Sequence, residues 1–348
     1  MTPKSGPQSE VRKIQLTGGS TYIVSLPKKW ITEHGLEARD QVRIEWRPSG
    51  TLRVIADAST VVRKREVNID CKEIPDNMIH DHLVAAYLSG ANRITINTNK
   101  EFTRNQNKNF RNFIKSTRGL EIINDQDSKL EIVSLLNPAE MPLYSSINRM
   151  YLLISRQVRD FSDVLLGESL EILEDSAERE NEIDALRLLL ERQIGQILES
   201  ASIEDSLGTS RWEASELCKL VRTLERMGDH SFALCDLASS YKIPSTISMT
   251  SLPISVIPIW QMSFKLLMSN LRKKKISEIH SAKSQLISSK QDLLQYEEEL
   301  RSSNIEIQDA LFLDRVSESL RRICAYSINM AEILMNIQTH RDSNQVYS

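Results

Sequence analysis

The most constraining feature of this chain is the spacing of its apolar residues from Pro142 onward. Long segments there repeat apolar residues every three or four positions and are separated by short polar breaks. Such spacing produces a helix with one apolar stripe, which must be buried against other helices. The pattern therefore predicts a helical bundle, with helices over 144–166, 168–200, 211–241, 255–275, 277–303 and 306–338.

The break at residues 242–253 divides these helices into two sets of three. An even division of this kind is typical of an internal duplication. We therefore expect a C-terminal all-α region, residues 142–340, of tandem three-helix bundles at 142–242 and 253–340. Only 5% of the residues are aromatic and 11 of 348 are glycine, which also favours helix over sheet.

Residues 9–58 have a different pattern and form a separate predicted domain. VRKIQLTGGSTYIVSLP and QVRIEWRPSGTLRVIA each alternate apolar and polar residues around a glycine turn, which predicts two β-hairpins. Between them, KKWITEH predicts a two-turn helix that starts near Pro27, with Ser25 as its cap and Gly35 at its end. Because so small a domain buries little apolar surface alone, we expect it to dimerise.

Residues 64–138 predict a small α+β module, so the fold class of the whole chain is multidomain α+β. REVNID and RITINT are expected strands, MIHDHLVAAYLSG and NKNFRNFIKSTRG helices, and LEIINDQDSKLEIVSLL a hairpin. His80 and His82 lie two residues apart and would point to different sides of a helix, which disfavours a metal role. No pattern in the module indicates its function.

Positive charge is concentrated at the N-terminus. Residues 1–66 contain 12 Lys and Arg against 7 Asp and Glu, although the whole chain has a net charge of -3. Arg12, Lys13, Lys28 and Lys29 are therefore our candidates for contacts with DNA phosphates. Such contacts give salt-dependent affinity but do not select a base sequence. The alternative is that these cations protect an exposed edge strand from aggregation.

Other features limit the class of protein. No segment is long and apolar enough for a membrane span or a signal peptide, so we expect no membrane insertion and a cytoplasmic location. The four cysteines form no C-x-x-C motif, which fits a reducing compartment. The chain also lacks a G-x-S-x-G motif and a Walker loop, and we expect no enzymatic activity.

Two pairs of acids in the first predicted bundle are spaced four residues apart. Glu180 and Asp184 form one pair, and Glu225 and Asp229 the other; each pair shares a helix face. About six such pairs are expected by chance, but both of these border an apolar stripe and so point partly inward. Four converging carboxylates require a cation. Oxygen ligands favour a hard cation, while His230 would admit a transition metal.

Two other interpretations of these acids stay open. They could form surface salt bridges, worth about 0–1 kcal/mol each, with Arg179, Arg187, Arg222 and Arg226. They could also belong to a di-iron carboxylate enzyme, which builds its site inside a four-helix bundle. That enzyme requires two E-x-x-H motifs, whereas Ile183 and Gly228 occupy the positions three residues after Glu180 and Glu225.

Two known families are similar to parts of this sequence. The segment VRKIQLTGGSTYIVSLPKKWITEHGLEARDQVRIEWRPSGTLRVIAD resembles the swapped-hairpin DNA-binding domain of the AbrB and MazE type (SpoVT-AbrB), in which two chains interlace into one β-barrel. ERENEIDALRL at 178–188 and LERMGDHSFALCDLA at 224–238 resemble the PhoU family of phosphate-signalling regulators, which are tandem three-helix bundles. The combination is similar to that of archaeal phosphate-uptake regulators.

These resemblances imply a homodimeric, DNA-binding transcriptional regulator of phosphate uptake. An adaptor that docks on a phosphate transporter or a sensor kinase, with the N-terminal domain serving only dimerisation, is the alternative. The PhoU resemblance further implies that the first bundle holds iron, zinc or a hard divalent cation. Its ligands would be Glu180, Asp184, Glu225 and Asp229.

The second predicted bundle departs from the family pattern. SLRRICAYSINMAEIL at 319–334 places Arg321 and Ala325 where the PhoU family has an acidic pair, and Ser288 and Asp292 occupy the other pair. We therefore expect no metal cluster in this bundle and expect Arg321 to provide a fixed internal charge.

Overall fold

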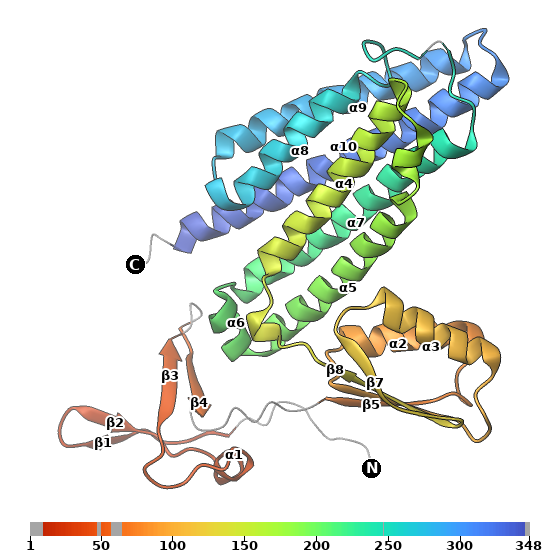
Figure 1. Ribbon diagram of the computed structural model, residues 1–348. Helices are drawn as coiled ribbons and strands as arrows, with labels where there is room; N and C mark the ends of the chain where they lie inside the picture. Colours follow the sequence, from red (N-terminus) through yellow and green to blue (C-terminus); the bar gives the residue numbers. More distant parts are fainter. Residues whose placement is uncertain (1–9, 47–49, 57–64, 246, 345–348) are drawn as a thin grey trace. The chain divides into compact units, whose positions relative to one another are not determined.

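The structure is a computed structural model that describes residues 10–46, 50–56, 65–245 and 247–344 (Figure 1). The chain divides into two compact units, Met1–Lys64 and Arg65–Ser348. The first unit contains short strands, and the second contains an α+β module followed by a long helical region. This succession of strand-rich, mixed and helical parts is the predicted fold class.

The first unit is built from two β-hairpins and a short helix. β1 (Gln15–Thr17) pairs with β2 (Thr21–Ile23), and β3 (Val42–Trp46) pairs with β4 (Leu52–Ala56), both antiparallel. Gly18 and Gly19 adopt φ of 64° and 82°, which allows the tight turn of the first hairpin. α1 (Lys28–Glu33) begins directly after Pro27, so the expected cap by Ser25 is wrong.

A single copy of this unit has almost no interior. Among its described residues only Leu36 and Ala56 are buried apolar side chains. The two hairpins form separate two-stranded sheets, and the described strands do not close a barrel. The expected barrel needs the strands of a second chain, which a single copy does not contain. Large apolar side chains are exposed along the hairpins: Val11, Ile14, Leu16, Tyr22, Ile23, Val24, Ile44 and Leu52.

The α+β module is a four-stranded sheet with the strand order β5-β6-β8-β7. β5 and β6 are parallel, which requires the crossover that α2 provides, and the other pairs are antiparallel. The helices α2 and α3 lie together on one face of the sheet (Figure 1). The elements are β5 (Glu66–Asp70), α2 (Ile79–Leu88), β6 (Arg93–Asn97), α3 (Arg104–Ser116), β7 (Leu120–Gln126) and β8 (Lys129–Ser134).

Long helices form the rest of the second unit and share one apolar core. α4, α5 and α7 make the first bundle, and α8, α9 and α10 make the second (Figure 1). The bounds are α4 (Leu143–Leu165), α5 (Ser176–Glu199), α7 (Arg211–Ser240), α8 (Val256–Lys273), α9 (Ile276–Arg301) and α10 (Ile307–Asn344). The segment 168–200, expected as one helix, is a 3-10 turn at Leu170–Leu173 followed by α5, and the short α6 (Ala201–Leu207) was not expected.

Hydrogen bonds from two arginines, Arg192 and Arg118, connect the α+β module with α5. Arg192 is only 2% exposed and donates to the carbonyl oxygens of Tyr87, at 2.5 Å, and Ala91, at 2.8 Å. These carbonyls lie at the end of α2 and just beyond its turn, where the helix dipole favours a cation. Arg118 also bonds to Glu182 at 3.0 Å. The module is therefore attached to the helix that carries Glu180 and Asp184.

We also searched the described helices for a membrane span. None of them combines the length and the apolar character that crossing a bilayer requires.

Candidate metal centre

The predicted acidic pairs lie on two neighbouring antiparallel helices, α5 and α7. Two ion pairs between these helices establish their direction: Arg187 with Glu225, and Glu191 with Arg222. Residue numbers rise along α5 as they fall along α7, so Asp184 lies opposite residues 228–229, and Glu225 lies about one turn away, opposite Arg187.

Three of the four predicted ligands converge. Oxygen atoms of Glu180, Asp184 and Asp229 all lie within 4.8 Å of one another. Within the described residues, this is the one set of three His, Cys, Asp or Glu side chains that meets this distance. Glu225 is not part of the set, and its carboxylate lies 3.3 Å from Nε of Arg187. Glu180 and Asp184 are half-buried, and Asp229 is more exposed.

Close packing of α5 against α7 occurs at the level of these acids. Ile183, beside Asp184, is 1% exposed, and its side chain packs over Gly228, beside Asp229. A Cβ atom at position 228 would lie 3.0 Å from Cγ2 of Ile183. Any larger residue there would press against α5, so the glycine allows the two helices to approach each other.

The surroundings of the site disfavour the ionised form of all four acids, Glu180, Asp184, Glu225 and Asp229. Burial raises the pKa of Glu180, and the neighbouring carboxylates Asp184, Asp229 and Glu225 raise it further. Burial also raises the pKa of Asp184, Glu225 and Asp229, while the positive charge of Arg187 acts in the opposite direction on these three. The native state therefore holds these carboxylates at an energetic cost that a bound cation would offset.

The donor set fits a hard cation. Three carboxylates offer oxygen ligands only, as Mg²⁺, Mn²⁺ and Ca²⁺ prefer, and carboxylates also ligate iron and zinc. His230 does not join them: its ring lies 5.9 Å from that of Tyr326 on α10. Burial and then Arg322 lower the pKa of His230. The expectation that His230 adds a nitrogen ligand is thus wrong for this structure.

The salt-bridge interpretation accounts for one acid of the four. Among the arginines that it invoked, Arg187 contacts Glu225. Arg179 instead binds Asp160 on α4, at 2.7 Å, and Asp175. Arg222 binds Glu191, and Arg226 lies over the ring of Tyr326 at 6.0 Å. The triad of Glu180, Asp184 and Asp229 has no arginine ion pair among the described residues.

The predicted DNA-contacting side chains are all exposed in the first unit. Lys13 lies before β1, and Lys28 and Lys29 open α1. Arg12 pairs with Glu10, and Lys29 lies 4.0 Å from Glu33. Their exposure meets the basic requirement for contact with a phosphate backbone.

In the second bundle, Arg321 forms a different kind of contact. Its Nε donates to Glu297 of α9 at 2.9 Å, and Ser317 donates to the same carboxylate. Glu297 is 5% exposed and was missed in the sequence, where it looks like one of many surface acids. Its position four residues after Leu293 and three before Leu300, in the apolar stripe, was the available signal. Ser288 and Asp292 are exposed.

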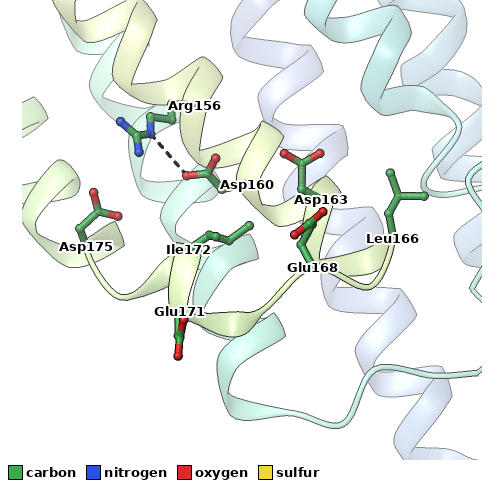
Figure 2. A pocket seen from close by; sticks show the side chains of 8 residues that line it. All are labelled: Arg156, Asp160, Asp163, Leu166, Glu168, Glu171, Ile172 and Asp175. Carbon is green, nitrogen blue, oxygen red and sulfur yellow. Dashed lines mark ion pairs between the residues drawn. The ribbon is translucent and has the colours of Figure 1, made fainter.

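A second acidic group lines a cavity of about 540 Å³ near the end of α4 (Figure 2). Here Asp160 is already engaged, since Arg156 lies 3.6 Å away and Arg179 2.7 Å away. The other acids around the cavity point in different directions (Figure 2). The lining residues are Arg156, Asp160, Asp163, Leu166, Glu168, Glu171, Ile172 and Asp175. This cavity does not gather carboxylates as the α5–α7 site does.

Comparison with known proteins agrees with this architecture. Residues 147–238, which contain both acidic pairs, match the PhoU domain family. Residues 15–60 match the family described as antidote-toxin recognition MazE, bacterial antitoxin. The chain thus contains a PhoU domain. More particularly, it combines a PhoU domain with an N-terminal MazE-like domain, which supports a role in the regulation of phosphate homeostasis.

A solved structure of PhoU from Pseudomonas aeruginosa is similar to part of the chain. The sequence identity is 16% and the TM-score 0.43, over 56% of this chain and 93% of the other. No curated protein matches the sequence.

Proposed function

We propose that this protein is a homodimeric, DNA-binding transcriptional regulator of phosphate uptake, whose PhoU-like helices sense the nutrient state. The observation that carries the proposal is the presence, in one chain, of a PhoU domain and a MazE-like domain with exposed cations. Its DNA target and four free cysteines suit a cytoplasmic protein.

Dimerisation through the first unit supports DNA binding in two ways. A second copy would cover the apolar side chains that one copy leaves exposed on its hairpins, such as Leu16 and Tyr22. It would also double the number of cations available to the phosphate backbone. The proposed phosphate contacts are Arg12, Lys13, Lys28 and Lys29.

The proposed sensor is the carboxylate site of the first bundle. Glu180, Asp184 and Asp229 would hold a divalent cation, which would supply the positive charge that the site lacks. The same residues bridge α5 and α7, so their mutual repulsion favours separation of the two helices. Because Arg192 attaches α5 to the α+β module, a change in α5 would reach that module directly.

A DNA-binding titration tests the proposal. Full-length protein is mixed with DNA from upstream of its own gene and of phosphate-uptake genes, at several salt concentrations. We expect the double variant Lys28→Ala/Lys29→Ala to bind at least about tenfold more weakly and with a shallower salt dependence. The matched control is Lys72→Ala/Lys100→Ala, which removes two exposed lysines of the α+β module. Equal binding by both double variants would refute the proposed DNA contact.

The alternative is an adaptor that docks on a phosphate transporter or a sensor kinase. It rests on the PhoU domain alone and assigns only dimerisation to the first unit. Retention of such a partner by the full-length protein, without any DNA binding at moderate salt, would favour this alternative.

A further inference from the structure

The four acids of the metal centre are not equivalent. Oxygens of Glu180, Asp184 and Asp229 lie within 4.8 Å of one another, whereas Glu225 lies outside this group. Yet Glu225 comes from the same face of α7 as Asp229, one turn away, and is half-buried. Its separation from the others therefore needs a local cause.

Arg187 provides that cause. It lies on α5 one turn after Asp184, and its Nε is 3.3 Å from the Glu225 carboxylate. Its Nη1 is also 3.6 Å from Glu191, a carboxylate that Arg222 contacts at 2.9 Å. Glu191 thus keeps a partner if Arg187 is lost, whereas Glu225 has no second ion pair within the part of the chain that the structure describes.

We propose that Arg187 is the resident counter-cation of this site, and that its guanidinium competes with a divalent cation for Glu225. The inference rests on the proposed metal site and extends it by naming the residue that limits its affinity. The fixed charge lies 3.3 Å from the Glu225 carboxylate and one helical turn from Asp184 on α5. An incoming cation would be repelled by the guanidinium, and it would find the fourth carboxylate, Glu225, already paired with Arg187.

The second bundle also contains an arginine–glutamate pair between two of its helices. There the acid, Glu297, lies on α9 and the arginine, Arg321, on α10. In the first bundle Arg187 of α5 pairs with Glu225 of α7, and Arg222 of α7 pairs with Glu191 of α5. An arginine–glutamate bridge between the two helices thus occurs in both bundles, while the carboxylate triad accompanies it only in the first, among the described residues.

The test is calorimetric titration of metal-stripped, full-length protein with Mn²⁺. Arg187→Met keeps an unbranched side chain and removes the charge, and we expect it to bind Mn²⁺ at least about tenfold more tightly than the wild type. Arg222→Met is the matched control, since it removes a cation of α7 that contacts Glu191 and not the acids of the site. We expect its affinity to stay within about twofold of wild type.

A second variant tests whether Glu225 is responsible for the expected increase in Mn²⁺ affinity. In the Arg187→Met background, Glu225→Gln should abolish the increase, because Glu225 is then the freed ligand. Unchanged or weaker Mn²⁺ binding by a folded Arg187→Met protein would overturn the inference while leaving the metal site intact. A gain that persists with Glu225→Gln would also overturn it. Absence of binding in wild type and in every variant would instead refute the metal site itself, and the inference with it.

Discussion

At the scale of single residues, Asp184 is an acid whose ionisation destabilises the metal-free native state. Its pKa is raised by burial, as are those of Glu180 and Asp229. Between the ordinary carboxyl pKa and the raised value, the native state binds more protons than the unfolded state. Stability of the metal-free protein therefore falls as the pH rises through this window, and the full cost is present above it.

Asp184→Asn should accordingly stabilise the metal-free protein at neutral pH. We expect a gain of about 1 kcal/mol, allowing for solvent screening at a half-buried site, and a weaker decline in stability with rising pH. Urea unfolding between pH 4 and 8, at values chosen to span the ordinary carboxyl range, measures both effects. Asp292→Asn, at the related exposed position of α9, is the control and should change little. Destabilisation by Asp184→Asn would contradict this account.

At the scale of elements, Gly228 controls how closely α7 packs on α5. Gly228→Ala would place a Cβ atom 3.0 Å from Ile183, so we expect the helices to separate and Mn²⁺ affinity to fall by about tenfold. Titration calorimetry measures the change. Gly195→Ala is the control, because a Cβ there meets only the Leu88 carbonyl oxygen at 3.7 Å.

The double variant Gly228→Ala/Ile183→Val should recover part of the affinity, since it removes the Cδ1 methyl that lies 3.1 Å from the added Cβ. If Gly228→Ala bound Mn²⁺ as tightly as the wild type, the spacing of the two helices would not govern the site.

Arg192 connects α5 of the first bundle with the end of α2 in the α+β module. We expect Arg192→Met to destabilise the second unit by about 2–4 kcal/mol, because the carbonyls of Tyr87 and Ala91 lose their buried donor. Hydrogen exchange should show the largest loss of protection in α2 and in the C-terminal half of α5. The control is Arg111→Met, which removes an exposed arginine of α3. Equal effects of the two substitutions would contradict a special role for the buried guanidinium.

Apolar spacing was sufficient to predict the long helices and the two hairpins, because each buries or presents one face along its whole length. Spacing also identified the acidic pairs on α5 and α7. It could not predict that Glu225 pairs with Arg187, that His230 lies near Tyr326, or that Arg192 and Glu297 are buried. Those outcomes depend on which helix packs against which face, and charged residues carry no periodic signal of their tertiary partner.

At the scale of the whole molecule, the proposed dimer depends on the first unit. Tyr22 is 73% exposed on β2, and Leu16 is 59% exposed on β1. Placing charge at both positions, in Leu16→Glu/Tyr22→Glu, should prevent burial by a second copy and give a monomer in sedimentation velocity. Thr17→Glu/Thr21→Glu, on the same strands, is the control and should remain a dimer. A dimer in both cases would place the dimer contact outside β1 and β2.

The nearly absent interior of the first unit has a consequence for how the protein is produced. During synthesis this segment leaves the ribosome before the long helices do, and a single copy has almost no interior in which to bury its apolar side chains. If the first unit folds only together with a second copy, its folded fraction depends on the protein concentration in the cell, as for any obligate homodimer. A fall in protein concentration would then reduce DNA binding by more than the same factor. The concentration of this protein would itself act as a regulatory signal.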